Sequence, residues 1–477
     1  MYEDIYFLDS KEALRVAAEH NRWGVDVAYN LQACYYDGQK IESDLPNLFH
    51  LPIENLLEGL VYGRERIPSQ IDFSGLDISS KVKMEILTHF NITMEQAKQY
   101  RVQINLKYLN EIKNFKPDFS EPLRFYLMAN DQTTVMQFVS KNIADVLKDM
   151  GYEVLYDLYR GTEDATCFKK IYELKPHVTI NINHLNNKFL SDDVFNFVWF
   201  QDYMEILKND ENIKLRERDF IFHLIKDFAD FLRIKGIESK YQPFCIDETR
   251  FKKREDIKKE KKIVFIGSSY SFRIEKLKND SSFNEVFADA LKIFEEKSCL
   301  KNLEHNDSDI RYLMNKYNKS EQYIADIYAY LTRDYCVEKL CSIETDYQIE
   351  VYGYGWEKND KVKSYFKGKV EYGEDISKIY NSATYGFCPG GYVLMQRTLE
   401  CACSETVPLV LDTRADLDSE YDKKLEESIE FFHIKDLEEI LKKPLPKDKR
   451  YDYAKEQHSY KHLVKRYLNI IKERVSG

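Results

Sequence analysis

The sequence predicts an α/β protein with two Rossmann-like domains, and three observations support this class. Short apolar strands alternate with amphipathic helices from about residue 124 to 244, and the alternation resumes from 263 to 411. A charged run at 252–262 separates the two stretches, and it reads as an interdomain linker. At 477 residues the chain is also too long for one ordinary core.

Composition excludes several classes of function. The formal net charge of −11 argues against non-specific binding to nucleic acid or to an anionic membrane. No apolar run approaches the roughly 20 residues of a membrane span, and residues 1–5 lack the start of a secretory signal, so a cytoplasmic protein is expected. The nine cysteines are scattered, which predicts reduced, buried thiols and no metal site.

Residues 1–120 are expected to form a mostly helical accessory region. Helices are predicted at 14–18, 78–90 and 94–115, with Thr93 and Gln96 placed as a capping box at the start of the last one. The pair around 91–93 has the form of a helix-turn-helix, but it lacks a basic recognition face. A role in binding an acceptor substrate of the following domains, or in self-association into a homo-oligomer, is therefore favoured over DNA binding.

The first Rossmann-like domain is predicted at 121–250. A strand at 124–129, a helix at 135–150 and a strand at 152–156 form a β-α-β unit, and strands at 178–182, 195–200, 220–224 and 241–244 follow. Ligands of such sheets bind beyond the carboxyl ends of the strands. The polar residues at those ends are Asn130, Asp131, Thr133, Asn183, His184, Gln201 and Asp202.

The second Rossmann-like domain is predicted at 251–450, followed by a closing helix in 451–477. Strands at 263–266, 349–352, 385–387 and 407–411 carry it, and a helical insertion occupies about 281–345. Two such domains should form a cleft between facing carboxyl ends, where ligand sites concentrate.

The stretch 385–412 predicts an anion site. Gly390 and Gly391 precede a predicted helix with the apolar stripe Met395, Leu399, Ala402 and Cys403. Bare amides and the helix dipole attract an anion. A phosphate at this mouth, with Arg397 and Glu400 deeper in, would suit a nucleotide. The alternative is a simple turn followed by a solvated Arg–Glu pair.

Four segments resemble the GT-B-fold glycosyltransferases, specifically their group-1-like, spore-maturation-type branch. Residues 240–251 resemble the run that ends the first domain, and 263–267 resemble the first strand and glycine of the second. Residues 370–381 resemble the approach to the donor site. The segment from Arg397 to Glu400 resembles the family's Arg-x-x-Glu, and 458–460 with Arg466 resemble its closing segment. The resemblance covers about 125–470.

The resemblance implies a glycosyltransferase that moves a sugar from a nucleotide-sugar donor, without metal or other cofactor, to a protein or glycan acceptor. A bacterial surface polysaccharide or a protein such as flagellin is the implied acceptor. The donor would contact Gly267, Ser268, Arg273, Tyr352, Trp356, Gly390, Gly391, Arg397 and Glu400. Tyr352, Tyr354 and Trp356 are candidates for the base, with a core position as the alternative.

One position departs from the family pattern and leaves the stereochemistry open. Many retaining members carry a glutamate where this chain has Tyr392. An inverting enzyme would need a base in its first domain, for which Asp131, His184 and Asp202 are the candidates. Two other functions stay open: a nucleotide-sugar epimerase of the same fold, and a non-catalytic binding or scaffold protein.

Overall fold

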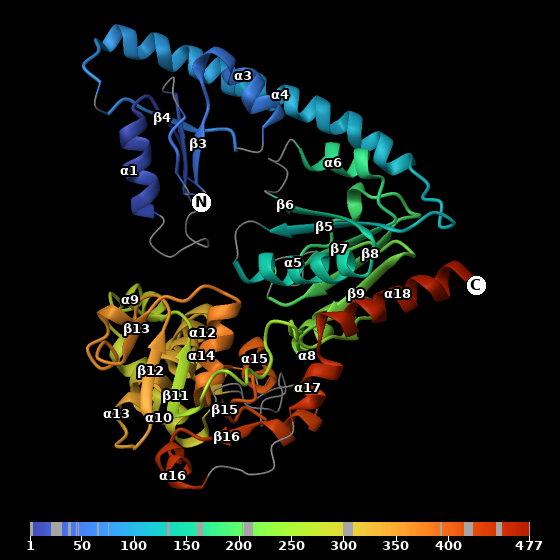
Figure 1. The fold of residues 1–477 in the computed structure, drawn as a ribbon. Coiled ribbons are helices and arrows are strands. Elements are labelled where there is room, and N and C mark those ends of the chain that lie inside the picture. Colours follow the sequence, from blue (N-terminus) through green and yellow to red (C-terminus); the bar gives the residue numbers. More distant parts are fainter. Residues whose placement is uncertain are drawn as a thin grey trace. The chain divides into compact units, whose positions relative to one another are not determined.

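The computed structural model divides the chain into two compact units, 1–222 with 467–477, and 223–466 (Figure 1). It describes residues 3–20, 31–36, 40–43, 45, 47–63, 66–74, 76–130, 134–159, 166–202, 204, 213–298, 309–391, 394–414, 423–444 and 451–476. The boundaries predicted at residues 120, 250 and 450 stay a proposal. None of the described helices is long and apolar enough to cross a membrane.

The N-terminal region is helical over most of its described length, but it also holds a parallel sheet that the sequence did not predict. The strands are β1 (Glu3–Phe7), β2 (Leu31–Tyr35), β3 (Leu48–His50) and β4 (Gln70–Asp72), in the order β3-β2-β1-β4. The helices are α1 (Ser10–His20), α3 (Leu56–Tyr62) and α4 (Ser80–Asn114). Strands of three residues are too short to show an alternating pattern, which explains why β3 and β4 were missed.

A single helix, α4, replaces the two helices predicted at 78–90 and 94–115. The predicted capping box was wrong, because Thr93 lies inside this helix and its hydroxyl donates to the carbonyl of His89 at 3.0 Å. With neither proline nor glycine between 78 and 115, nothing breaks the helix at Asn91.

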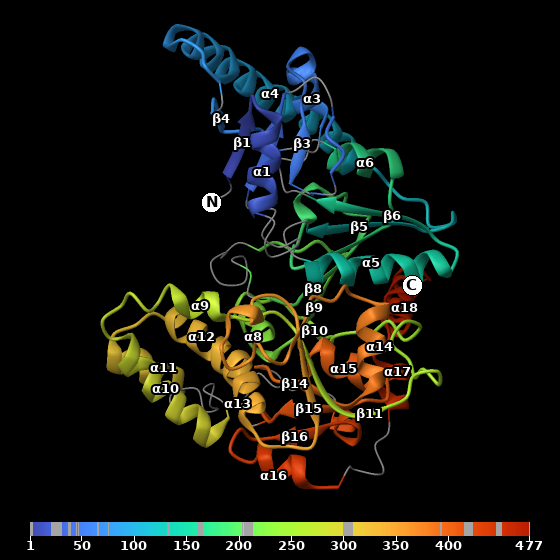
Figure 2. The same cartoon turned by 60° about the vertical axis from the view of Figure 1, so that its left-hand side comes forward.

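The second sheet confirms the strand pattern predicted after residue 121. Its strands are β5 (Arg124–Asn130), β6 (Glu153–Tyr159), β7 (Val178–Ile182), β8 (Phe195–Phe200), β9 (Asp219–His223) and β10 (Lys240–Tyr241). They lie in the order β10-β9-β8-β7-β5-β6, and the pairs β5–β6, β5–β7 and β7–β8 are parallel. The helix α5 (Thr134–Asp149) packs on β5 and β6 (Figure 2). The order of strands reverses between β5 and β7, which makes this the switch point of the sheet.

The third sheet has the strand order of a dinucleotide-binding Rossmann domain. Its strands are β11 (Glu260–Ile266), β12 (Gln348–Tyr352), β13 (Phe366–Gly368), β14 (Ala383–Cys388), β15 (Val407–Leu411) and β16 (Glu430–Phe432). All neighbours are parallel in the order β13-β12-β11-β14-β15-β16, so the direction of winding changes between β11 and β14.

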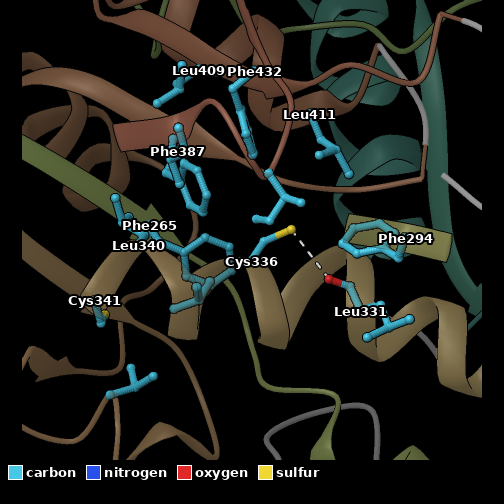
Figure 3. Packing of buried hydrophobic residues seen from close by; sticks show 14 of the residues in the cluster. Phe265, Phe294, Leu331, Cys336, Leu340, Cys341, Phe387, Leu409, Leu411 and Phe432 are labelled. Atoms are coloured by element: carbon cyan, nitrogen blue, oxygen red, sulfur yellow. Dashed lines mark hydrogen bonds between the residues drawn. The ribbon is translucent and has the colours of Figure 1, made fainter. Parts of the chain in front are cut away.

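Helices cover both faces of the third sheet. One core joins alternate strand residues such as Phe265, Phe387 and Leu409 to the helical insertion (Figure 3). The insertion comprises α10 (Phe283–Lys297), α11 (Asp309–Tyr317), α12 (Glu321–Tyr330), the π-helix η4 (Leu331–Tyr335) and α13 (Cys336–Ser342). The other core joins residues such as Val264 and Val410 to α14 (Glu374–Ser382) and α15 (Gln396–Cys403).

One predicted connection is corrected, and a second has contacts that the sequence did not indicate. In the run 252–262, predicted as an interdomain linker, the Arg254 amide donates to Oδ1 of Asn381 at 2.7 Å and the Arg254 guanidinium pairs with Glu374. The predicted closing helix is split into α17 (Asp452–Gln457) and α18 (Tyr460–Ser476). The chain is extended between them, where Ser459 pairs with Ile246 in a parallel bridge.

Candidate functional site

The candidate site lies at the switch point of the third sheet. The loop after β11 runs from Gly267 to α9 (Ser271–Glu275), and the loop after β14 leads through Gly390 and Gly391 to α15. Loops that follow the two central strands on either side of a switch point bound the crevice where such sheets bind ligands. The two segments predicted to hold the donor are therefore neighbours at the carboxyl edge of the sheet.

Two glycines let these loops approach closely. A Cβ on Gly267 would occupy the place of the Arg397 guanidinium, so this side chain reaches from α15 across to β11. A Cβ on Gly353, whose φ is +128°, would collide with the backbone of Gly267. Gly267 and Arg397, which the sequence placed at one site, are thus brought together.

The amides of the loop after β11 are largely used inside the protein. Four of them donate to protein oxygens: Gly267 to Tyr352 O, Ser269 to Tyr354 O, Tyr270 to Asp334 Oδ2 and Ser271 to Ser269 Oγ. An anion at this loop therefore meets mainly side chains, in contrast to the glycine-rich loops that cradle phosphate with their backbone.

Three arginines surround this loop, and they come from three different elements. Arg273 lies on α9 and pairs with Asp326 at 3.0 Å. Arg333 lies on η4, with its guanidinium 3.7 Å from the centre of the Tyr270 ring. Arg397 lies on α15 over the Phe265 ring. Within the described part of the chain, Arg333 and Arg397 form no ion pair with a carboxylate.

The surroundings make Arg333 an unusual cation. Burial, together with the charges of Arg397 and Arg273, lowers its pKa to about 10, against the opposing influence of Tyr270 and Asp334. Its Nε is buried and has no hydrogen-bond acceptor among the residues described, and the same holds for Nε of Arg273. An unsatisfied buried donor of a charged group costs roughly 1–3 kcal/mol, which an anionic ligand can offset.

Glu400 lies next to this positive cluster. It is one turn after Arg397 on α15 and only 4% exposed. Burial raises the pKa of its carboxyl to about 7, although Arg397 and a hydrogen bond with Gln396 act in the opposite direction. The carboxyl therefore changes charge near neutral pH.

Helix α15 begins later than predicted. It starts at Gln396, and Met395 precedes it in an extended conformation, so Met395 is not part of the helical stripe. Gly390 packs against the Met395 thioether, and a Cβ on Gly391 would lie 3.4 Å from Cε1 of Tyr328. The predicted placement of the glycine amides directly at the helix N-terminus is thus corrected, because α15 begins only at Gln396.

The three aromatic residues at the end of β12 and just after it differ in burial: Trp356 lies in the core, whereas Tyr352 and Tyr354 are half-buried. Trp356 is fully buried, and its Nε1 donates to the carbonyl of Gly267 at 2.5 Å. The predicted contact of Trp356 with a base is therefore corrected to a structural role. The Tyr352 hydroxyl donates to Glu350 at 2.8 Å, while Tyr354 is half-buried under the ammonium group of Lys369, 4.2 Å from the ring centre.

The carboxyl edge of the second sheet joins residues from β7 and β8. Asn183 donates to Oδ2 of Asp202 at 2.8 Å, and its Oδ1 accepts from the amides of Gln201 and Asp202 at 2.7 and 3.1 Å. Partial desolvation raises the pKa of Asp202 and lowers that of the half-buried His184. Asp131 and Thr133 lie outside the described residues.

Sequence reasoning missed Arg333 and Asp334. Both lie within the helical insertion, far along the chain from the loop that they contact. Their only signal was a pair of adjacent charges in a helical stretch that also carries Asp326, Glu338 and Lys339, which is too common to be diagnostic. No cluster of three or more metal-binding side chains is found in the described residues.

Comparison with known proteins gives distant structural similarity only. No family model and no curated protein matches the chain. AviGT4, a glycosyltransferase involved in avilamycin A biosynthesis, is 12% identical over 73% of this chain and 96% of its own, with a TM-score of 0.41. Anabaena HepE in complex with UDP-glucose is 7% identical over 74% of this chain and 100% of its own, with a TM-score of 0.40.

A UDP-N-acetylglucosamine 2-epimerase shows a still weaker similarity. It is 9% identical over 100% of this chain and 97% of its own, with a TM-score of 0.26. Similarities of this size assign neither fold nor function by themselves. The functional interpretation therefore rests on the residues at the site.

Proposed function

We propose that this protein is a glycosyltransferase that binds a nucleotide-sugar donor at the switch point between β11 and β14. One observation carries the proposal. Arg333 and Arg397 lie at this switch point without an ion pair among the described residues, next to the buried carboxyl of Glu400. A diphosphate matches the two guanidinium groups, since arginine binds phosphate oxygens in a bidentate manner.

The positive cluster suits the chemistry of glycosyl transfer. Negative charge grows on the diphosphate as the bond to the sugar breaks, and preorganised cations lower the free energy of that transition state. Arg273 contributes less, because Asp326 already balances its charge. We assign the larger part of the stabilisation to Arg333 and Arg397.

Glu400 is proposed to bind the ribose. An ionised carboxylate accepts hydrogen bonds from two hydroxyls, which is the role that acidic residues play in nucleotide-binding Rossmann domains. Burial raises the pKa of Glu400 to about 7 while Arg397 opposes this shift, so the ionised form that would bind the ribose predominates above about pH 7. Ser268, Gly390 and Gly391 remain proposed contacts of the phosphates or of the sugar, and Tyr352 remains one of the base.

The base that deprotonates the acceptor is proposed to come from the strand ends of the second sheet. Desolvation raises the pKa of Asp202, which makes its carboxylate a stronger base than an ordinary aspartate. Asn183 orients its carboxylate. His184 and Asp131 are the alternatives. The family resemblance supports a metal-independent enzyme with a bacterial surface glycan or a protein such as flagellin as acceptor, in the cytoplasm.

Calorimetry and turnover test this function together. UDP, GDP, ADP and inorganic pyrophosphate should bind to the wild type, and Arg397→Leu should abolish most of that affinity. A nucleotide-sugar panel should be consumed only when a glycan or protein acceptor is present. Conversion of a donor without acceptor would identify an epimerase instead, and an absence of both binding and turnover would identify a non-catalytic protein.

A further inference from the structure

We propose that Asp334 is a positioning residue, which holds the loop Gly267–Ser271 and the Arg333 guanidinium in the arrangement that binds phosphate. This role rests on the proposed function. Asp334 is fully buried, and the sequence did not indicate that it belongs to the site.

One carboxylate organises three successive loop residues. Its Oδ1 accepts from the Ser269 hydroxyl at 2.5 Å, and its Oδ2 accepts from the Tyr270 amide at 2.7 Å. The Ser269 hydroxyl in turn accepts from the Ser271 amide at 3.1 Å. The conformation of the loop between β11 and α9 is therefore set by a side chain of the helical insertion.

Arg333 contacts the same loop from the neighbouring position. Its guanidinium stacks on the ring of Tyr270, the residue whose amide donates to Asp334, and its Nη1 donates to the carbonyl of Ser268 at 3.4 Å. Two adjacent side chains thus hold the loop: Asp334 through Ser269 and the Tyr270 amide, and Arg333 through the Ser268 carbonyl and the Tyr270 ring. If Asp334 no longer fixes Tyr270, Arg333 loses the surface that aligns it.

The π-helix explains how two adjacent residues reach one loop. Leu331, the first residue of η4, and Cys336, which follows η4, point into the core, where the Cys336 thiol donates to the carbonyl of Leu331 at 3.4 Å (Figure 3). The wider turn of η4 lets Arg333 and Asp334 both contact the Ser268–Tyr270 backbone. Short π-helical segments occur frequently at functional sites.

Glu338 on α13 offers a matched control. It is also a buried carboxylate, and it accepts hydrogen bonds from Tyr330 at 2.9 Å and from Asn359 and Lys361 at 2.8 Å. None of these donors belongs to the loop after β11. Its loss should affect folding stability but not phosphate binding.

Calorimetric titration with inorganic pyrophosphate, together with thermal unfolding, tests the role of Asp334. Asp334→Ala should weaken pyrophosphate binding by about 10-fold or more, since misplaced binding groups lose most of their effect. Asp334→Asn should restore binding to within about threefold of the wild type, because its amide oxygen still accepts from the Tyr270 amide. Glu338→Gln should leave the affinity unchanged.

The outcomes separate this role from the proposed function. If the wild type does not bind pyrophosphate, both the proposed function and the role of Asp334 are wrong. If the wild type binds and Asp334→Ala binds equally well, only the role of Asp334 is overturned. Equal weakening by Glu338→Gln would also overturn it, because the effect would then be general. Should Asp334→Ala fail to fold, Ser269→Ala replaces it, and unchanged affinity in that variant contradicts the proposal.

Discussion

The two six-stranded sheets share a winding principle but differ in the chemistry of their carboxyl edges. The edge at β11 and β14 gathers guanidinium groups and a buried carboxyl, whereas the edge at β7 and β8 gathers amides, a histidine and an exposed carboxylate. Topology therefore determines where a ligand can bind, and the residues carried to that place determine which ligand. The cationic edge fits phosphates, and the mixed polar edge fits hydroxyl groups and proton transfer.

The largest effect is expected at the polar edge. Asp202→Asn should lower kcat by about 10²- to 10⁴-fold, the usual contribution of a general base, and leave the affinity for nucleoside diphosphates unchanged. Steady-state kinetics and calorimetry measure the two quantities. Asp192→Asn, an exposed position on the same unit, is the control. If Asp202→Asn remains active while His184→Gln does not, the base is His184.

The cationic edge should show the reverse pattern. Arg397→Leu should weaken UDP and pyrophosphate binding by roughly 10- to 100-fold, because charged hydrogen bonds are lost. Calorimetry measures this change, and Arg233→Leu, an exposed arginine of α8 (Lys226–Ile234), is the control. Unchanged affinity for both ligands in Arg397→Leu would place the phosphate elsewhere.

The backbone of Gly353, after β12, packs closely on that of Gly267, after β11, at the cationic edge. The free energy of unfolding of glycine variants tests this contact. Gly353→Ala should lower the free energy of unfolding by about 1–3 kcal/mol from backbone strain alone, and by more because its Cβ meets the Gly267 backbone. Gly368→Ala is the matched control, since its φ is +114° but no atom lies within 4 Å of the added Cβ. Equal losses in urea denaturation would contradict the close approach.

The smallest effect concerns pH. Because the pKa of Glu400 rises from 4.5 to about 7 on folding, the native state binds the proton more tightly. The stability from this group is complete below about pH 4.5 and is lost as pH rises through about 7. Between pH 5 and 8, the free energy of unfolding of the wild type should fall by roughly 1–3 kcal/mol more than that of Glu400→Gln.

Urea denaturation of the two proteins over this pH range measures the difference. Parallel pH profiles would show that Glu400 does not titrate in this window. Between pH 5 and 8, the free energy of unfolding of Asp202→Asn should fall as much relative to Glu400→Gln as that of the wild type does. The pH effect then belongs to Glu400 and not to Asp202.

Local patterns predicted most of the sheet strands but only part of the site. The strands at 178–182, 195–200 and 407–411 were predicted with the bounds that the structure has, because continuous apolar runs between polar loops are diagnostic. Gly267 was singled out because it follows a predicted strand, and Arg397 because it lies on the helix predicted after Gly391. The fully buried position of Trp356 was not predictable, since a tryptophan after a strand suits a core and a binding site equally.

Long-range contacts account for what the sequence did not reveal. Asp334 meets Ser269 and Tyr270 only because the helical insertion folds back onto the sheet, and no local pattern encodes that return. The N-terminal sheet was missed for a related reason. Its short strands β3 and β4 are defined by pairing with β2 and β1, and they have no signature of their own.

The buried Nε of Arg333 has a consequence for handling the protein. A buried guanidinium nitrogen without an acceptor among the described residues costs stability, so an anion that binds to it shifts the folding equilibrium by mass action. At a concentration of 100 times Kd, such an ion adds about 2.7 kcal/mol to the free energy of unfolding. Phosphate or sulfate in a buffer would thus raise Tm and compete with nucleotides for the proposed site. Melting curves and affinities should therefore be measured in buffers without these salts.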